Sequence, residues 1–446
     1  MSSLFPYPDY RSSGTDWIGE VPATWDVVAT ARVSDLTTGE RDTQDAIEEG
    51  AYPFFVRSQT VERINTYSFD GEGVLTSGDG AGVGKIFHHA TGKFEIHQRV
   101  YLFFNFRRII GKYFFYFLRE HLHLVALAGN AKSTVDSLRR PMLRMFPICV
   151  PNLEEQTQIA RFLDYETAKI DALIEKQEQL IALLKEKRQA VISHAVTKGL
   201  DPSAPLRDSG IEWLGQVPAH WKVAKSGFYL RILSGYAFPS SGFASDDTGV
   251  RLLRGINVGV GVVRWEDTVR WKRRPGDGLD QWDLTEGDLV VGMDRPMITE
   301  GVRVAKLRRE DVPSLLLQRV ASLKPRPTLN GDYMMQLLSF TKLFEAHFAP
   351  ETTGVSVPHI SPKQIADFSI PIPPRREQDA IVAWVKERLE KTDRLVSSAE
   401  AAAALLAERR TALISAAVTG KIDVRGWKPP EGSEDRSASE RAEEVA

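Results

Sequence analysis

The sequence has almost no cysteine, no long apolar run and almost no net charge. Cys149 is the single cysteine among 446 residues, so no disulfide can form within the chain, and we expect a reducing cytoplasm. We expect Cys149 to be a small buried hydrophobe rather than a nucleophile. The chain has no run of about 18 apolar residues and begins without the basic and apolar regions of a signal peptide. We therefore expect neither a membrane span nor a signal peptide.

The motifs of nucleotide hydrolysis are also missing. The glycine-rich segment 77–85 resembles a phosphate-binding loop, but that loop would need glycine where Asp79 stands and Ser or Thr where Ile86 stands. Without the hydroxyl there is no ligand for magnesium. The segment is better explained as a glycine-rich turn between two strands, with Lys85 at its end.

Methyl transfer is a second enzymatic activity to test against the sequence. Residues 69–73 match the F-x-G-x-G of enzymes that use adenosylmethionine. Those that modify base amino groups also need Asn or Asp before a Pro-Pro-aromatic triplet, and neither Pro373–Pro374 nor Pro429–Pro430 has these neighbours. Because H-E-x-x-H, G-x-S-x-G and clustered Cys/His spacings are absent too, we expect no catalytic residue and no metal site. The histidines expected to be surface or partly buried residues rather than ligands are His88, His89, His121 and His123.

An internal repeat organises the chain. Residues 11–27 align with 207–223, and 10 of the 17 positions are identical. Residues 146–201 align with 368–423 without a gap, and 22 of the 56 positions are identical. The intervening segments, 28–145 and 222–367, share little sequence. The repeated parts form two similar frames, and the intervening segments are two dissimilar inserts. This arrangement suits a protein that performs the same function on two different targets. Duplication followed by random drift would have changed the frames as much as the inserts.

The second repeat predicts two long helices. Each follows a proline-marked stop and begins with acidic residues, and each ends near a glycine, Gly199 or Gly420. A span of about 43 residues is roughly 60–65 Å long. Such a helix cannot bury an apolar stripe alone, so we expect the two to pair antiparallel about a pseudo-two-fold axis; two separate coiled coils with other proteins are the alternative. The expected a/d positions of the first helix are 159, 163, 166, 170, 173, 177, 180, 184, 187 and 191.

The two intervening segments, 28–145 and 222–367, are called the private segments below. Their hydrophobic patterns indicate both strands and helices. Strands are predicted at 51–56, 73–76, 99–104 and 288–291, and helices at 109–124 and 333–347. The predicted fold is therefore α+β, with two mixed α/β domains separated by two long antiparallel coiled-coil helices. The expected parts are a first domain at 1–150, a first helix at 151–200, a second domain at 201–372, a second helix at 373–421 and a disordered tail at 422–446.

Three motifs, each present twice in the same order, resemble the specificity subunits of type I restriction-modification systems. They are the W-[IL]-G-x-V-P-x-x-W segments at 17–25 and 213–221, the E-Q-x-x-I helix starts at 155–159 and 377–381, and the R-x-A-[VL]-I-S-x-A-V-T helix ends at 188–197 and 410–419. The resemblance covers nearly the whole chain.

The resemblance implies that each private domain is a target recognition domain that reads one half of a split double-stranded DNA site. It further implies that the paired helices set the spacing of the halves and dock two modification subunits, which methylate adenine, while restriction subunits translocate and cleave DNA. The chain itself would then bind no cofactor, and adenosylmethionine, ATP and Mg would belong to the partners. A net charge of −2 fits this arrangement, since partners would share the phosphate contacts.

Candidate DNA-facing residues are polar residues in turns, where side chains can reach base edges. In the first domain these are Ser77, Lys85, Asn130, Lys132 and Ser133, and in the second they are Arg254, Asn257, Arg295, Ser356 and His359. For each arginine a surface ion pair is the structural alternative. The residues expected at the partner interface are those of the helix starts, Glu155, Gln156, Ile159, Glu377, Gln378 and Ile381. A scaffold that joins proteins through its coiled coil without reading DNA remains the alternative function.

Overall fold

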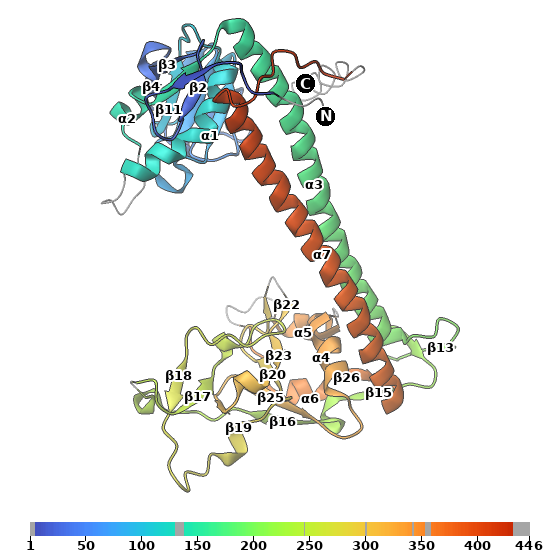
Figure 1. The fold of residues 1–446 in the computed structure, drawn as a ribbon. Helices are drawn as coiled ribbons and strands as arrows, with labels where there is room; N and C mark the ends of the chain where they lie inside the picture. The colour runs from blue at the N-terminus through green and yellow to red at the C-terminus, as the bar shows by residue number, and fades with distance from the viewer. Residues whose placement is uncertain are drawn as a thin grey trace. The chain divides into compact units, whose positions relative to one another are not determined.

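The structure is a computed structural model, and it describes residues 5–129, 138–244, 246–298, 301–340, 343–352 and 358–430 (Figure 1). The chain forms two compact units. Unit 1 combines residues 1–178 with 400–446, and unit 2 comprises residues 179–399. Each unit therefore contains one private domain, one half of each long helix and one copy of the repeated frame.

The frame of unit 1 is built from short antiparallel strand pairs beside the long helix. Strand β1 (Tyr10–Ser12) pairs with β2 (Glu20–Pro22), and β3 (Asp26–Ala29) pairs with β12 (Pro147–Val150), directly before helix α3 (Leu153–Lys198). The tryptophans of the repeated motif explain why this frame is retained. Trp25 is buried, and the ring of Trp17 stacks on that of Phe146 with centroids 5.7 Å apart.

Two four-stranded sheets form the private domain of unit 1. Their orders are β6-β5-β10-β7 and β4-β11-β8-β9. The strands are β4 (Asp35–Thr38), β5 (Tyr52–Phe55), β6 (Glu62–Ile64), β7 (Phe69–Asp70), β8 (Gly73–Ser77), β9 (Phe87–Ala90), β10 (Lys93–Ile96) and β11 (Val100–Phe104). Helix α1 (Gly111–Gly129) packs against β8 and β9, and α2 (Arg140–Arg144) precedes β12.

Unit 2 repeats this plan. In its frame β13 (Leu206–Asp208) pairs with β14 (Gln216–Pro218), and β15 (Lys222–Lys225) pairs with β26 (Ser369–Ile372). The other strands are β16 (Leu230–Ser234), β17 (Val250–Leu253), β18 (Val269–Trp271), β19 (Asp283–Leu284), β20 (Leu289–Gly292), β21 (Met297–Ile298), β22 (Gly301–Val302), β23 (Val304–Lys306), β24 (Ser314–Leu316) and β25 (Val320–Pro325). The helices are α4 (Gly331–Phe340), α5 (Leu343–Thr352), α6 (Pro362–Asp367) and the first half of α7 (Arg375–Val418).

The two private domains have the same strand topology although they share little sequence. The sheets of unit 2 have the orders β18-β17-β24-β19 and β16-β25-β20-β23, which correspond strand by strand to those of unit 1. Even the parallel pair is kept, since β10 runs parallel to β5 and β24 parallel to β17. The duplication therefore includes the inserts as well as the frames.

The long helices pair antiparallel within each unit. In unit 1 the guanidinium of Arg410 on α7 lies 2.7 Å from the carboxylate of Asp171 on α3, and in unit 2 Arg188 on α3 lies 3.2 Å from Asp393 on α7. The residue numbers of both pairs add up to 581, so the same antiparallel register holds in both units. Together with the matching sheets, this confirms the predicted fold class.

The expected a/d stripe is only half right. The positions at 163, 170, 177, 184 and 191 face inward, but the alternate set is shifted by one residue to 167, 174, 181 and 188. Leu173 and Leu180, expected in the seam, are 45% and 44% exposed. The sequence could not separate the two registers, because each of these leucines is followed by an isoleucine, Ile174 or Ile181.

A buried tyrosine closes the end of a long helix in each unit. The hydroxyl of Tyr113 lies 3.0 Å from the carbonyl oxygens of both Cys149 on β12 and Val418 near the end of α7. The hydroxyl of Tyr333 lies 2.8 and 3.0 Å from those of Val196 near the end of α3 and Pro371 on β26. The last carbonyls of a helix have no partner within it, so each hydroxyl satisfies a group that burial would otherwise leave unpaired.

The segment after α7 packs on unit 1. Val424 is buried, and the ring of Trp427 lies 5.3 Å from that of Phe162 on α3. The backbone amide of Asp423 donates to the carbonyl of Phe5 over 2.8 Å. The expectation of a disordered tail from residue 422 is therefore wrong for residues 422–430, because Val424 is buried in the core of unit 1 and Trp427 is half-buried against α3. Residues 431–446 lie outside the described part of the chain.

Single residues behave largely as the sequence indicated. Cys149 is buried, and burial raises the pKa of its thiol to about 12, which suits a packing residue. His88 and His121 are buried, so the expectation of surface or partly buried positions is wrong for these two, and burial lowers the pKa of both imidazoles. Among the described residues, no helix combines the length and the apolar character that crossing a membrane requires.

Replacing Tyr113 or Tyr333 with phenylalanine should destabilise the protein, because each change removes the hydroxyl donor that serves a buried carbonyl at the end of a long helix. We expect each variant to lose about 1–3 kcal/mol of unfolding free energy in urea denaturation. Tyr52→Phe is the matched control, since the Tyr52 hydroxyl has no hydrogen-bond partner among the described residues. Equal stability of all three variants would show that the hydroxyls do not close the helix ends.

His121 should make unit 1 sensitive to acid. Its ring lies 5.2 Å from that of Trp17, and burial lowers its pKa to about 4, below its ordinary value of 6.5. Its neutral form therefore stabilises the fold fully above pH 6.5, and this contribution is lost as the pH falls towards 4. The stability difference between the wild type and His121→Gln should narrow by about 2 kcal/mol between pH 8 and pH 5. A difference that is constant with pH would contradict this account.

Candidate nucleic-acid interface

A groove of about 530 Å³ opens in the private domain of unit 2. Four arginines line it, of which Arg264, Arg295 and Arg319 are exposed. The complete lining is Gly255, Ile256, Val258, Gly259, Arg264, Asp294, Arg295, Ile298, Arg303, Leu317, Gln318 and Arg319. Three exposed guanidinium groups around one concavity provide donors that suit phosphates and guanine edges.

The fourth arginine, Arg303, supports the groove from below. Its Nε donates to the carbonyl of Val258 and its Nη1 to that of Asp294, both over 3.0 Å, while its Nη2 bonds to Gly255. Burial lowers the pKa of this guanidinium. Arg303 therefore fixes the backbone of three lining residues.

Asp294 binds the side chains of an arginine and a histidine at the edge of the groove. Its Oδ2 accepts from Nη1 of Arg319 over 2.6 Å, and its Oδ1 lies 2.6 Å from Nδ1 of His359. Burial alone would raise the pKa of Asp294, but the hydrogen bonds from Arg319 and His359 outweigh it and keep the pKa below its ordinary value. The carboxylate is therefore ionised and orients both partners.

The groove brings together only part of the predicted set of unit 2. Arg295 lines it and His359 lies at its edge through Asp294. Arg254 instead forms an ion pair with Asp267 at 2.8 Å, the structural alternative stated above. Asn257 is buried, and its side-chain amide donates to the carbonyl of Arg264 over 2.9 Å, so it braces a turn and offers no surface to DNA.

Unit 1 has a cluster that corresponds to the one around Asp294 in unit 2. In both, basic side chains surround one aspartate, and we call each an acid-centred cluster. Asp79 accepts from Nη1 of Arg57 over 2.9 Å and from Nη1 of Arg99 over 2.8 Å. Burial would raise the pKa of Asp79, but hydrogen bonds from both arginines outweigh it and lower the pKa. The cluster lies in the turn after β8, at the position that Asp294 occupies after β20.

The glycine-rich segment of unit 1 is a turn between β8 and β9, as expected. Lys85 is exposed on it, whereas Ser77 is fully buried and donates to the carbonyl of Asp79 over 3.0 Å. Ser77 therefore cannot reach a base in this conformation. The remaining candidates, Asn130, Lys132, Ser133 and Ser356, lie outside the described residues.

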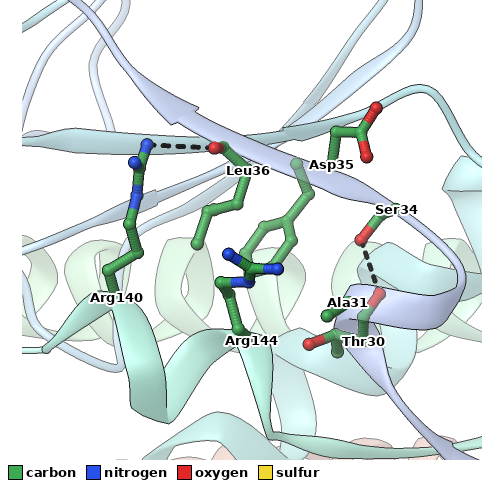
Figure 2. A pocket seen from close by; sticks show the side chains of 8 residues that line it. Thr30, Ala31, Ser34, Asp35, Leu36, Arg140 and Arg144 are labelled. Carbon is green, nitrogen blue, oxygen red and sulfur yellow. Dashed lines mark hydrogen bonds between the residues drawn. The ribbon is translucent and has the colours of Figure 1, made fainter.

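A smaller hollow of about 180 Å³ lies between α2 and β4 in unit 1 (Figure 2). Arg140 and Arg144 enter it from α2, and Nη2 of Arg140 donates to the carbonyl of Leu36 over 3.0 Å. Asp35 at its rim is bound by Arg107, whose hydrogen bond lowers the pKa of the carboxyl. The hollow presents the basic cluster of residues 139–144 to solvent, and its chemistry suits an anion.

The residues expected at the partner interface lie mostly inside their own units. Gln156 and Gln378 are fully buried, and the side-chain amide of each makes three hydrogen bonds to backbone groups. Two of the three bonds of Gln156 go to the loop before α1, residues 108–110. Two of the three bonds of Gln378 go to the loop before α4, residues 328–330. They tie the start of a long helix to its private domain. The expected contact with a partner subunit stays a prediction for the whole set.

The other four residues of that set also have partners within the chain. Glu155 is buried and accepts from the hydroxyl of Tyr7 over 2.5 Å. Glu377 accepts from the indole of Trp221 over 3.0 Å. Ile159 and Ile381 are fully buried in the apolar cores of units 1 and 2.

Sequence reasoning missed the residues that form the acid-centred clusters. One signal was present, because Gln98–Arg99–Val100 recurs as Gln318–Arg319–Val320 inside the otherwise dissimilar segments. Three matching residues are too few to stand out in an alignment. Only the equivalent strands on either side show that the two tripeptides occupy the same turn.

Comparison with known proteins gives a consistent result. A family model described as the type I restriction modification DNA specificity domain matches residues 22–183. The MjaVIII specificity subunit of Methanocaldococcus jannaschii is 27% identical over 433 residues, which cover 91% of this chain and 94% of that protein. The EcoAI specificity subunit of Escherichia coli is 30% identical over 221 residues, 50% of this chain, and the match spans only 37% of that protein's length.

Over these ranges the chain is similar to the DNA specificity subunits of type I restriction-modification systems.

Two solved structures are similar to this chain in fold. A chain from a structure of a type I restriction-modification system matches with a TM-score of 0.68 at 16% identity, covering 90% of this chain and 99% of that one. The HsdS subunit of Thermoanaerobacter tengcongensis matches with a TM-score of 0.51 at 17% identity, covering 90% and 98%. At these identities the likeness concerns the fold alone.

Proposed function

We propose that this chain is the non-catalytic DNA reader of a type I complex, in which each private domain reads one half of a split DNA site. The observation that carries the proposal is the duplication of one topology with different exposed residues. Equal frames hold equal sheets, but an arginine-lined groove marks unit 2 and a glycine-rich turn with Lys85 marks unit 1. Equal scaffolds with unequal surfaces are what two different half-sites require.

We further infer that modification and restriction subunits supply the chemistry, and that adenosylmethionine, ATP and Mg bind to them. The missing proline motif and the incomplete nucleotide loop of this chain support that division. Two equivalent pairs of exposed leucines on the long helices suit two copies of one partner. They are Leu173 and Leu405 in unit 1 and Leu183 and Leu395 in unit 2. A single exposed leucine needs no explanation, but its recurrence at equivalent positions of both units supports an interface on each.

The net charge of the chain supports the proposal that partner subunits share the contacts with DNA phosphates. The chain carries −2 overall, while a protein that binds DNA alone usually neutralises many phosphates with its own lysines and arginines. The exposed arginines gather instead at local sites, such as the groove of unit 2. A scaffold that never meets DNA would gain nothing from such a groove, which weighs against the alternative function.

Recognition should be modular. When residues 28–145 are replaced by the equivalent segment of another specificity subunit, mapping of N6-methyladenine should show one half of the motif changed and the other retained. The matched control is the reciprocal exchange of 222–367, which should change the opposite half. Neither the unmodified chain nor the hybrids should methylate DNA without the modification subunit. Alteration of both halves by one exchange would contradict independent reading.

We also propose that the helix pair sets the spacer between the half-sites. One heptad inserted after Leu184 of α3 and one after Val396 of α7 lie opposite each other in the observed register, so both seams continue. Each helix lengthens by about 10 Å at roughly 1.5 Å per residue. At about 3.4 Å per base pair, the spacer should grow by about three pairs.

The heptad variant should also be less active, because three pairs turn the second half-site by roughly a third of a helical turn. A heptad inserted in α3 alone is the control, and we expect it to lose methylation since it breaks the pairing. The spacer is read by methylation mapping. An active double insertion with an unchanged spacer would show that the helices tether the domains without measuring DNA.

A further inference from the structure

One turn is duplicated between the two private domains in sequence, in a backbone hydrogen bond and in a side-chain ion pair, although Arg319 has a positive φ of 68° and Arg99 does not. Gln98–Arg99–Val100 joins β10 to β11, and Gln318–Arg319–Val320 joins β24 to β25. The carbonyl of Arg99 accepts from the amide of Gly78 over 2.8 Å, and that of Arg319 accepts from the amide of Met293 over 2.9 Å. In each unit the residue after this amide donor is the aspartate of the cluster.

The side chains match equally well. Nη1 of Arg99 donates to Oδ2 of Asp79 over 2.8 Å, and Nη1 of Arg319 donates to Oδ2 of Asp294 over 2.6 Å. The two arginine side chains are 57% and 63% exposed, and the two aspartates 25% and 23%. Each carboxylate also contacts a second nitrogen-bearing side chain through Oδ1, Arg57 in unit 1 and His359 in unit 2.

Folding does not explain this duplication. An ion pair with such an exposed arginine contributes little to stability, because water solvates both groups well without the contact. The surrounding segments have diverged so far that little else of their exposed sequence matches. A feature that the fold does not need, kept in both domains, indicates a task that both domains perform.

The geometry of the pair identifies the ligand. With Nη1 held by the aspartate, Nε and Nη2 remain without a hydrogen-bond partner among the described residues, and together they form a flat edge with two parallel donors. A carboxylate beside this edge repels a phosphate, but it orients the guanidinium towards a neutral acceptor pair. The O6 and N7 atoms of guanine in the major groove are such a pair.

We propose that Arg99 and Arg319 are equivalent guanine-reading residues, one for each half of the split site, held in position by Asp79 and Asp294. This inference rests on the proposed function and adds a contact that both half-sites share. In unit 2 the arginine borders the groove, where Gln318 and Arg295 are also exposed and can read adjoining positions. Each half-site therefore contains a guanine on one of its strands.

The test replaces each arginine with lysine in the complete complex with its modification subunits. Lysine keeps the positive charge but not the two-donor edge, so Arg99→Lys should relax one G·C position in one half-site and Arg319→Lys one position in the other. Discrimination at that position should fall by about 5- to 160-fold, the value of a bidentate contact. Methylation mapping and competition binding with duplexes substituted at each G·C pair both report it.

Arg108→Lys is the matched control, because Arg108 forms a comparably exposed ion pair, 2.5 Å from Asp26, that lines neither the groove nor the hollow. It should leave every position of the motif unchanged. Asp79→Asn and Asp294→Asn should weaken discrimination at the same positions as the arginine variants. Competition binding keeps the test decisive for any variant that no longer supports methylation.

Three results would overturn the proposal. One is a lysine variant with wild-type discrimination at every position, and another is a half-site without guanine on either strand. The third is equal weakening on all duplexes with a shallower salt dependence, which would assign the arginines to phosphates instead. In each case the wild-type complex would still methylate a split motif. A wild type without a split motif would refute the proposed function itself.

Discussion

Burial of one long helix against the other, with its end closed by a tyrosine hydroxyl, is the interaction on which the rest of the structure depends. A helix of 46 or 44 residues has an apolar stripe that it cannot bury alone, and its last carbonyls have no partner within the helix. The other long helix buries the stripe, and Tyr113 and Tyr333 provide the donors for the carbonyls. Each hydroxyl lies between the end of one long helix and the strand that leads into the other. Helix pairing, frame and private domain are thereby joined in each unit.

This arrangement separates the parts that must stay constant from those that can vary. Gln156 and Gln378 bind each private domain to its helix through backbone groups only, so the side chains of the insert are free to change. The frame keeps Trp17 on Phe146 and Trp213 on Phe368, which fixes the entrance and exit of the insert. The inserts then retain their topology while their grooves and turns diverge. A nearly neutral chain can in this way still present arginines where a half-site needs them.

Much of the fold could be predicted because it depends on local pattern and on the repeat. Four predicted strands were correct, because short runs of β-branched and aromatic residues bounded by glycine or proline rarely form anything else. They are 51–56, 73–76, 99–104 and 288–291, which match β5, β8, β11 and β20. The seam between the helices was misassigned by one residue in every second position, because adjacent leucine and isoleucine fit either register.

The site was harder to predict than the fold. Polar residues in turns serve the backbone as often as a ligand, and this explains why Ser77 and Asn257 are buried. Arg99 and Arg319 could not be found by spacing, because the aspartates that orient them lie 20 and 25 residues earlier in the chain. Only the sheets bring each pair together.

The most direct test of the central claim is a map of N6-methyladenine in a host that expresses this chain with its modification subunit and has no other adenine methylation. Two equal frames that carry different private domains predict that the chain specifies a single methylated motif. That motif should have two specified halves of different sequence, separated by a spacer of fixed length. A continuous motif, a spacer of variable length or the absence of methylation dependent on this chain would contradict the account.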